Sequence, residues 1–154
     1  MFRNYQQSDP FNLNRKRSTR NTNKRTYNCA GYALGTYSWY CPHDGEKDWI
    51  HDYSFGTIEE AWRETLKAVA HMVRDFPTLR VISNVKEATR KERVIAFRLS
   101  SDGDFHYLKR AHNNRWYHKR GSKNCIEHMT DYEAMNMDWC DRYDGPIVLM
   151  AIEK

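Results

Sequence analysis

The sequence predicts a single α+β domain in which helices come first and pack on a mostly antiparallel sheet that follows them. The chain has 154 residues, which fits one domain with a substantial core. Its first half holds an apolar stripe at helical spacing, and its second half holds short β-prone segments separated by turn signals. Hydrophobic residues make up 40% of the chain and no run of roughly 18 apolar residues occurs, so we expect a globular protein without a membrane span.

The beginning of the chain differs in charge from the rest. Residues 1–26 carry seven Lys or Arg and a single acid, Asp9, whereas the remainder carries 18 basic and 19 acidic residues. We interpret residues 1–25 as a basic extended arm, either solvated or contacting an anionic polymer or a host protein, and residues 26–154 as the domain. The N-terminus lacks the apolar segment of a secretory signal, so we expect a cytoplasmic protein with free thiols.

The first helix is expected over residues 29–40. Asn28 is a suitable N-cap, and Cys29, Tyr32 and Tyr37 then fall on one helical face. Because Cys29 opens this helix, its side chain is expected in the first turn.

The second helix has the clearest signal in the chain. Thr57 and Glu60 match a capping box, an apolar stripe continues to Phe76, and Pro77 ends the pattern. The polar segment between the two helices, residues 41–56, contains Pro and Gly and is expected to be a loop.

The second half of the chain reads as a succession of strands. Asp102-Gly103 is a hairpin signal between two of them. A short helix is expected over residues 130–142, with Tyr132, Met135 and Trp139 on one side. The expected strands cover residues 79–82, 94–100, 105–110, 115–118 and 147–152.

Cys29 and two histidines form a candidate catalytic constellation. A thiol nucleophile needs a base, and it gains from free N–H groups and the dipole at a helix N-terminus. Of the seven histidines, His106 and His118 lie in expected strands that flank one hairpin. A connecting loop of odd length puts both on one face, whereas a two-residue Asn113-Asn114 turn puts them on opposite faces.

Two segments resemble the NlpC-type, papain-like cysteine peptidases. "NCAGYAL" at residues 28–34 is similar to the nucleophile motif of that family, and "HYLKRAHNNRWYH" at residues 106–118 is similar to its hairpin with two histidines. The resemblance implies a papain-like fold. It also implies Cys29 as nucleophile, His106 as base and His118 as the residue that orients the base.

The resemblance further implies a hydrolase, a peptidase or amidase that passes through a thioester and needs no cofactor. Its substrate would be a peptide or amide, such as a cell-wall peptide or a host protein. The backbone N–H of Cys29 is expected to stabilise the oxyanion, with Tyr27, Asn28 and Trp39 at the oxyanion site or in the substrate cleft. A compact domain without an export signal would also suit a phage-encoded enzyme.

Other interpretations of the same residues stay open. Cys29 and His106 are also compatible with a packed core, and Asn124 or Asn136 could replace His118 as the third catalytic member. A binding or inhibitor protein that uses the arm and an aromatic surface is the alternative to an enzyme. A small zinc module would use two thiols and two imidazoles. Its ligands would be Cys41, His43, Cys125 and His128.

Overall fold

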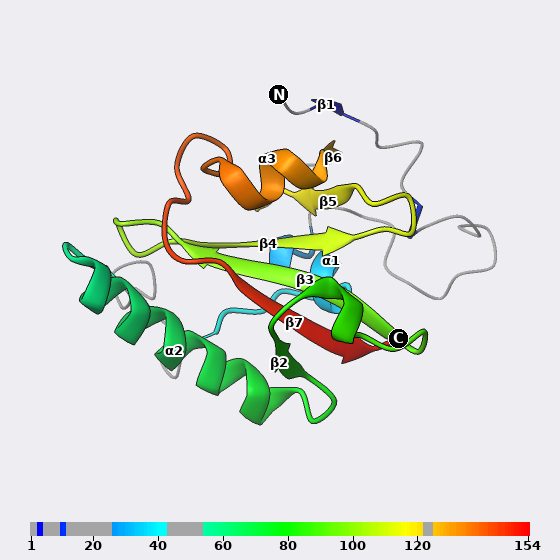
Figure 1. The fold of residues 1–154 in the computed structure, drawn as a ribbon, viewed down its shortest axis with the longest axis horizontal. Coiled ribbons are helices and arrows are strands. Elements are labelled where there is room, and N and C mark those ends of the chain that lie inside the picture. Colours follow the sequence, from blue (N-terminus) through cyan, green and yellow to red (C-terminus); the bar gives the residue numbers. More distant parts are fainter. Residues whose placement is uncertain (1–2, 5–9, 12–25, 43–53, 122–124) are drawn as a thin grey trace.

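A computed structural model of the chain describes residues 3–4, 10–11, 26–42, 54–121 and 125–154 (Figure 1). These residues form one seven-stranded sheet in the order β1-β6-β5-β4-β3-β7-β2, with antiparallel pairing throughout and three α-helices. The expected α+β class with a mostly antiparallel sheet is therefore confirmed. The elements are β1 (Arg3–Asn4), α1 (Cys29–Leu34), α2 (Ile58–Asp75), β2 (Arg80–Ile82), a 3-10 turn η4 (Val85–Glu87), β3 (Glu92–Leu99), β4 (Phe105–Arg110), β5 (Trp116–Lys119), β6 (Ile126–Met129), α3 (Asp131–Asn136) and β7 (Val148–Glu153).

The two faces of the sheet are covered by different parts of the chain. Helices α1 and α2 pack on one face, where Ala33 and Met72 join a core cluster with Phe97 and Tyr107. Helix α3 and the segment after it cover the other face, where Trp139 belongs to a second cluster (Figure 1). Alternate residues of a strand point to opposite faces, so each strand contributes side chains to both layers.

Helix α2 and the β3–β4 hairpin form where the local signals predict them. The Thr57 hydroxyl accepts from the N–H of Glu60, and the Glu60 carboxylate accepts from the N–H of Thr57, which completes the capping box. The hairpin turns at Asp102-Gly103, with Leu99 paired to Phe105. Strand β4 has the expected bounds.

The loop between β4 and β5 determines which way the two histidines face. Arg110 pairs with Trp116, and the N–H of Ala111 donates to the carbonyl of Arg115, which leaves an odd number of residues in the turn. Asn114 takes a left-handed φ of 64° to close it. The two-residue Asn113-Asn114 turn is thereby excluded, and the histidines of β4 and β5 lie on one face, the face covered by α3.

Several elements differ from the expectation. Helix α1 ends at Leu34 instead of continuing to residue 40, because Gly35 adopts a left-handed φ of 80° and stops it. Strand β6 was not expected. Helix α3 is shorter than the predicted 130–142, and its Tyr132 is 69% exposed while Trp139 is buried beyond the end of the helix.

The predicted N-terminal arm lies mostly outside the described residues. Within it, β1 pairs with β6 through Arg3 and Asn4. The ring of Phe11 meets the rings of Tyr32 and Tyr117 edge-on at 6.2 and 6.1 Å. These two points of the arm therefore contact the domain. No helix among the described residues has the length and apolarity needed to cross a membrane.

Candidate active site

A directly bonded pair of histidines lies on the α3-facing side of the sheet. The Nε2 atom of His106 in β4 lies 2.8 Å from Nδ1 of His118 in β5, with both side chains buried. Burial lowers the pKa of His106 to about 3, with further contributions from the cationic Arg120 and Arg142. Burial likewise lowers the pKa of His118 well below its ordinary value. The pair is therefore neutral at pH 7, and its hydrogen bond joins two imidazoles rather than two imidazolium ions.

Cys29 occupies the first position of α1. The carboxamide oxygen of Asn28 caps the helix by accepting from the N–H of Gly31. The same oxygen accepts from the backbone N–H of Tyr40, and the carboxamide nitrogen donates to the backbone carbonyl of Tyr40. This side chain therefore fixes both the start of α1 and the loop that follows. The Cys29 thiol is buried, and burial raises its pKa strongly, although a hydrogen bond from the backbone N–H of Tyr107 opposes the shift.

The hydrogen bond to Tyr107 places the sulfur at the edge of β4 that faces β5. The ladder between these strands consists of Lys109 with Tyr117 and Arg110 with Trp116, and it does not extend to Tyr107. The N–H of Tyr107 is thus given to the Cys29 sulfur instead of to β5. His106 precedes Tyr107 in β4 and points to the α3-facing side of the sheet, whereas Cys29 packs in the cluster with Tyr107 beneath α1 and α2.

A tyrosine that is held by a neighbouring acid packs against His106. The ring of Tyr143 stacks on His106 with a centroid distance of 4.9 Å and an interplanar angle of 18°. Its hydroxyl donates to Asp104 at 3.0 Å, and burial raises the pKa of this phenol, so it stays protonated. Arg142 bridges Asp104 and Asp102 with contacts of 2.5 and 2.9 Å. This network holds the plane of the His106 ring.

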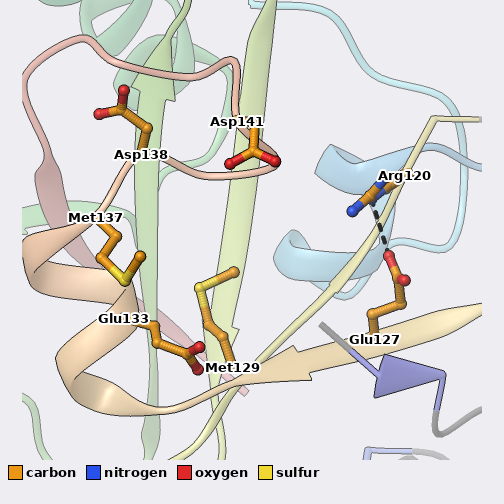
Figure 2. A pocket seen from close by; sticks show the side chains of 7 residues that line it. All are labelled: Arg120, Glu127, Met129, Glu133, Met137, Asp138 and Asp141. Carbon is orange, nitrogen blue, oxygen red and sulfur yellow. Dashed lines mark ion pairs between the residues drawn. The ribbon is translucent and has the colours of Figure 1, made fainter. Parts of the chain in front are cut away.

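A pocket of about 360 Å³ shares the residue Glu127 with the surroundings of His118 (Figure 2). Its wall includes Glu127, whose Oε1 lies 4.0 Å from Nε2 of His118 and 2.9 Å from Nε of Arg120. Figure 2 shows this ion pair on one side of the pocket and Glu133, Met137 and Asp138 on the other. Four carboxylates against one guanidinium make the pocket acidic. Its lining residues are Arg120, Glu127, Met129, Glu133, Met137, Asp138 and Asp141.

A second thiol, that of Cys140, lies close to the histidine pair, although no sequence motif points to it. Among the residues that the structure describes, His106, His118 and Cys140 are the group whose possible metal-ligand atoms gather, all within 4.8 Å of one another. Cys140 and Asp141 both have left-handed φ values, 56° and 54°, in a tight turn between Trp139 and Tyr143. The sequence does not predict this contact, because Cys140 is distant from both histidines along the chain and lies on irregular backbone.

The remaining predicted site residues lie around the helix start. Tyr27 is 1% exposed and packs edge-on against Tyr37, with its backbone carbonyl accepting from the ammonium group of Lys119 at 2.5 Å. Trp39 is 51% exposed, on the loop after α1. Of the three cleft candidates, Trp39 alone offers a substantial surface to a ligand, and Tyr27 and Asn28 hold the helix start in place.

The structure describes some of the alternative third catalytic residues and of the predicted zinc ligands, and others lie outside the described residues. Asn124 lies outside the described residues, and the exposed Asn136 donates to the carbonyl of Tyr132. His118 is therefore the described side chain bonded to His106. In the zinc set, His43 lies outside the described residues, and Nδ1 of His128 accepts from Arg115 at 2.8 Å.

Comparison with known proteins assigns the chain to a family. Residues 18–148 match the family described as Domain of unknown function (DUF7689), and the chain belongs to it. Neither the curated proteins nor the solved structures contain a match.

Proposed function

We propose that the protein is a papain-like cysteine hydrolase, a peptidase or amidase, in which Cys29, His106 and His118 act together. The observation that carries this proposal is which ring nitrogens join the two histidines. His106 uses Nε2 toward His118, which leaves its Nδ1 as the nitrogen for the thiol. The resemblance of residues 28–34 and 106–118 to the NlpC-type peptidases supports the same roles.

The hydrogen bonds suggest how the base is oriented. The carboxylate of Glu127, 4.0 Å from Nε2 of His118, favours the tautomer of His118 that carries its proton on Nε2. Nδ1 of His118 then accepts from Nε2–H of His106. In this arrangement Nδ1 of His106 carries a lone pair and can take a proton, which is the task of a general base.

The reaction begins from a neutral thiol and a neutral imidazole, because burial raises the pKa of Cys29 and lowers that of His106. As the sulfur attacks the substrate carbonyl, its proton passes to Nδ1 of His106. The backbone N–H of Cys29 stabilises the oxyanion, and the imidazolium returns the proton to the leaving amine. Water then attacks the thioester, releases the acid and restores the thiol.

The acidic pocket beside His118 bears on the substrate. Its four carboxylates favour a peptide or amide that carries a positive charge near the bond to be cut. Met129 and Met137 add apolar surface to the same wall, which suits the aliphatic stem of such a side chain.

Acylation of Cys29 is the direct test. The protein is treated with p-nitrophenyl acetate at neutral pH, release of p-nitrophenol is followed, and the acetylated residue is identified by mass spectrometry. We expect a burst that acetylates Cys29, is absent in Cys29→Ala and is at least about 100-fold slower in His106→Ala, the usual contribution of a general base.

Two matched variants control for non-specific acylation. Cys41→Ala removes a partly exposed thiol outside the site, and His112→Ala removes an exposed histidine of the β4–β5 turn. Both should keep the burst. The proposal fails if Cys29 is acetylated no faster than Cys41, or if His106→Ala leaves its rate unchanged.

A further inference from the structure

We propose that His106, His118 and Cys140 form a binding site for a borderline divalent cation of the Zn²⁺ class. The three side chains come from β4, β5 and the turn after α3, and their possible ligand atoms lie within 4.8 Å of one another. Two imidazoles and one thiolate are a ligand set that zinc accepts, with a fourth position left for water or substrate. This set shares no member with the Cys41, His43, Cys125 and His128 set expected from the sequence.

The facing nitrogens of the histidine pair are close to the separation that two ligands of one ion require. Metal–nitrogen bonds of about 2.0–2.1 Å in a tetrahedral site hold two nitrogens about 3.3 Å apart. The facing nitrogens of His106 and His118 are 2.8 Å apart, so binding requires a widening of about half an ångström and a turn of both rings that directs their lone pairs toward the cation. Both imidazoles are neutral, as ligands must be, because burial lowers the pKa of each.

The two histidines also contact neighbouring groups that are typical of a metal site. A ligating histidine commonly directs its other nitrogen to a carboxylate, and Glu127 lies 4.0 Å from Nε2 of His118. The stacked ring of Tyr143 fixes the plane of His106. These contacts orient both imidazoles before a cation arrives.

Cys140 is held so that it can supply the thiolate. Its backbone has a left-handed φ of 56°, an uncommon conformation for a residue other than Gly, Asn or Asp. Burial raises its thiol pKa to about 11, while Arg120 opposes the shift by its charge and by a hydrogen bond to the sulfur. A divalent cation would replace Arg120 as the partner of the thiolate, and Arg120 would retain Glu127 at 2.9 Å.

The binding itself does not require catalysis by Cys29. Its consequence for activity does rest on the proposed function: a cation bound to both histidines occupies the nitrogen pair that orients the base. Zinc would then slow the acylation of Cys29.

Cobalt titration tests the site without reference to activity. The whole protein is treated with a chelator, exchanged into buffer and titrated with Co²⁺, whose tetrahedral thiolate complexes show near-ultraviolet charge-transfer and visible d–d absorption. We expect one Co²⁺ per chain, displaced by one equivalent of Zn²⁺. Cys140→Ser should abolish the charge-transfer band and weaken binding at least about 100-fold, since it removes a ligand outright.

Three further variants separate this site from other thiols. Cys41→Ser and Cys29→Ala should both keep the charge-transfer band, and His118→Gln should lose it, with circular dichroism confirming that each protein is folded. Absence of the band in the wild-type protein overturns the proposal. So does a band that survives in Cys140→Ser or that disappears in Cys29→Ala. Persistence of the band in Cys29→Ala also keeps the metal site distinct from the hydrolase, whose failure would be seen in the acylation assay alone.

Discussion

Lowering the pH from about 7 to about 5 should destabilise the folded protein through its buried histidine pair. His106 has a pKa of about 3 in the folded state against an ordinary value of 6.5, because burial disfavours its charged form. The unfolded chain therefore binds more protons below about pH 6.5, so the stabilisation is complete above that pH and is lost as the pH falls toward 3. Between about pH 7 and pH 5 this single histidine lowers the free energy of unfolding by about 2 kcal/mol. His118 shifts in the same direction and adds to the loss.

Urea denaturation at a series of pH values, followed by tryptophan fluorescence, measures this effect. Buried Trp116 and Trp139 lie in the core on the side of the sheet that carries the pair, so they report on its unfolding. In His106→Gln the difference in unfolding free energy between about pH 7 and pH 5 should shrink by about 2 kcal/mol, whatever the absolute stability of the variant. His112→Gln, which removes an exposed histidine of the β4–β5 turn, should keep the wild-type dependence. A wild-type free energy that stays constant over this range, or an equal flattening in both variants, would refute the reasoning.

Substitutions at three further positions test helix capping and packing by the same denaturation measurement. Gly31→Ala should cost at least about 3 kcal/mol, because an added Cβ would lie 1.8 Å from the backbone oxygen of Ser38 and backbone cannot move aside cheaply; a loss below about 1 kcal/mol would contradict the packing. Thr57→Ala should cost about 1 kcal/mol by removing the acceptor for the N–H of Glu60, and Thr57→Ser should restore it. Lys109→Ala should cost about 3 kcal/mol, because it empties a buried site and removes an ammonium that lies 4.0 and 4.1 Å from two aromatic ring centroids. Lys109→Met refills the volume without the charge, so equal losses in the two Lys109 variants would assign the whole effect to the cation.

The parts of the fold that the sequence predicts are those encoded by neighbouring residues. The capping box of Thr57 and Glu60 sets the start of α2, and Asp102-Gly103 sets the β3–β4 turn, so both elements form as expected. Helix α1 is shorter than predicted because its apolar spacing continues past Gly35, whose left-handed backbone ends the helix. Strand β6 is only four residues long and lacks a comparable local signal. Its pairing depends on contacts with β5 and β1.

The candidate site likewise contains residues that the local sequence places correctly and residues that it could not place. His106 and His118 could be placed on one face from the parity of a single loop, since one extra residue moves every later side chain to the other face. Cys140 and Tyr143 could not be placed there, because both arrive through an irregular turn after α3 that has no hydrophobic period. Local patterns thus identify one strand face, and the tertiary path of the chain decides what covers it.

The Cys29 thiol and the histidine pair approach β4 from different sides of the sheet, because side chains alternate along the strand. Tyr107 points into the core beneath α1 and α2, whereas His106 points to the other face. A thiol packed among the side chains beneath α1 would therefore be separated from His106 by the sheet. Where β4 and β5 separate, however, the N–H of Tyr107 is directed sideways and the Cys29 sulfur accepts it. Cys29 thus packs in the cluster beneath α1 and α2, while its sulfur reaches the edge of β4 at Tyr107. Extending the β4–β5 ladder by two more residue pairs would bring Tyr107 opposite Lys119, give this N–H to β5 and remove it from the Cys29 sulfur.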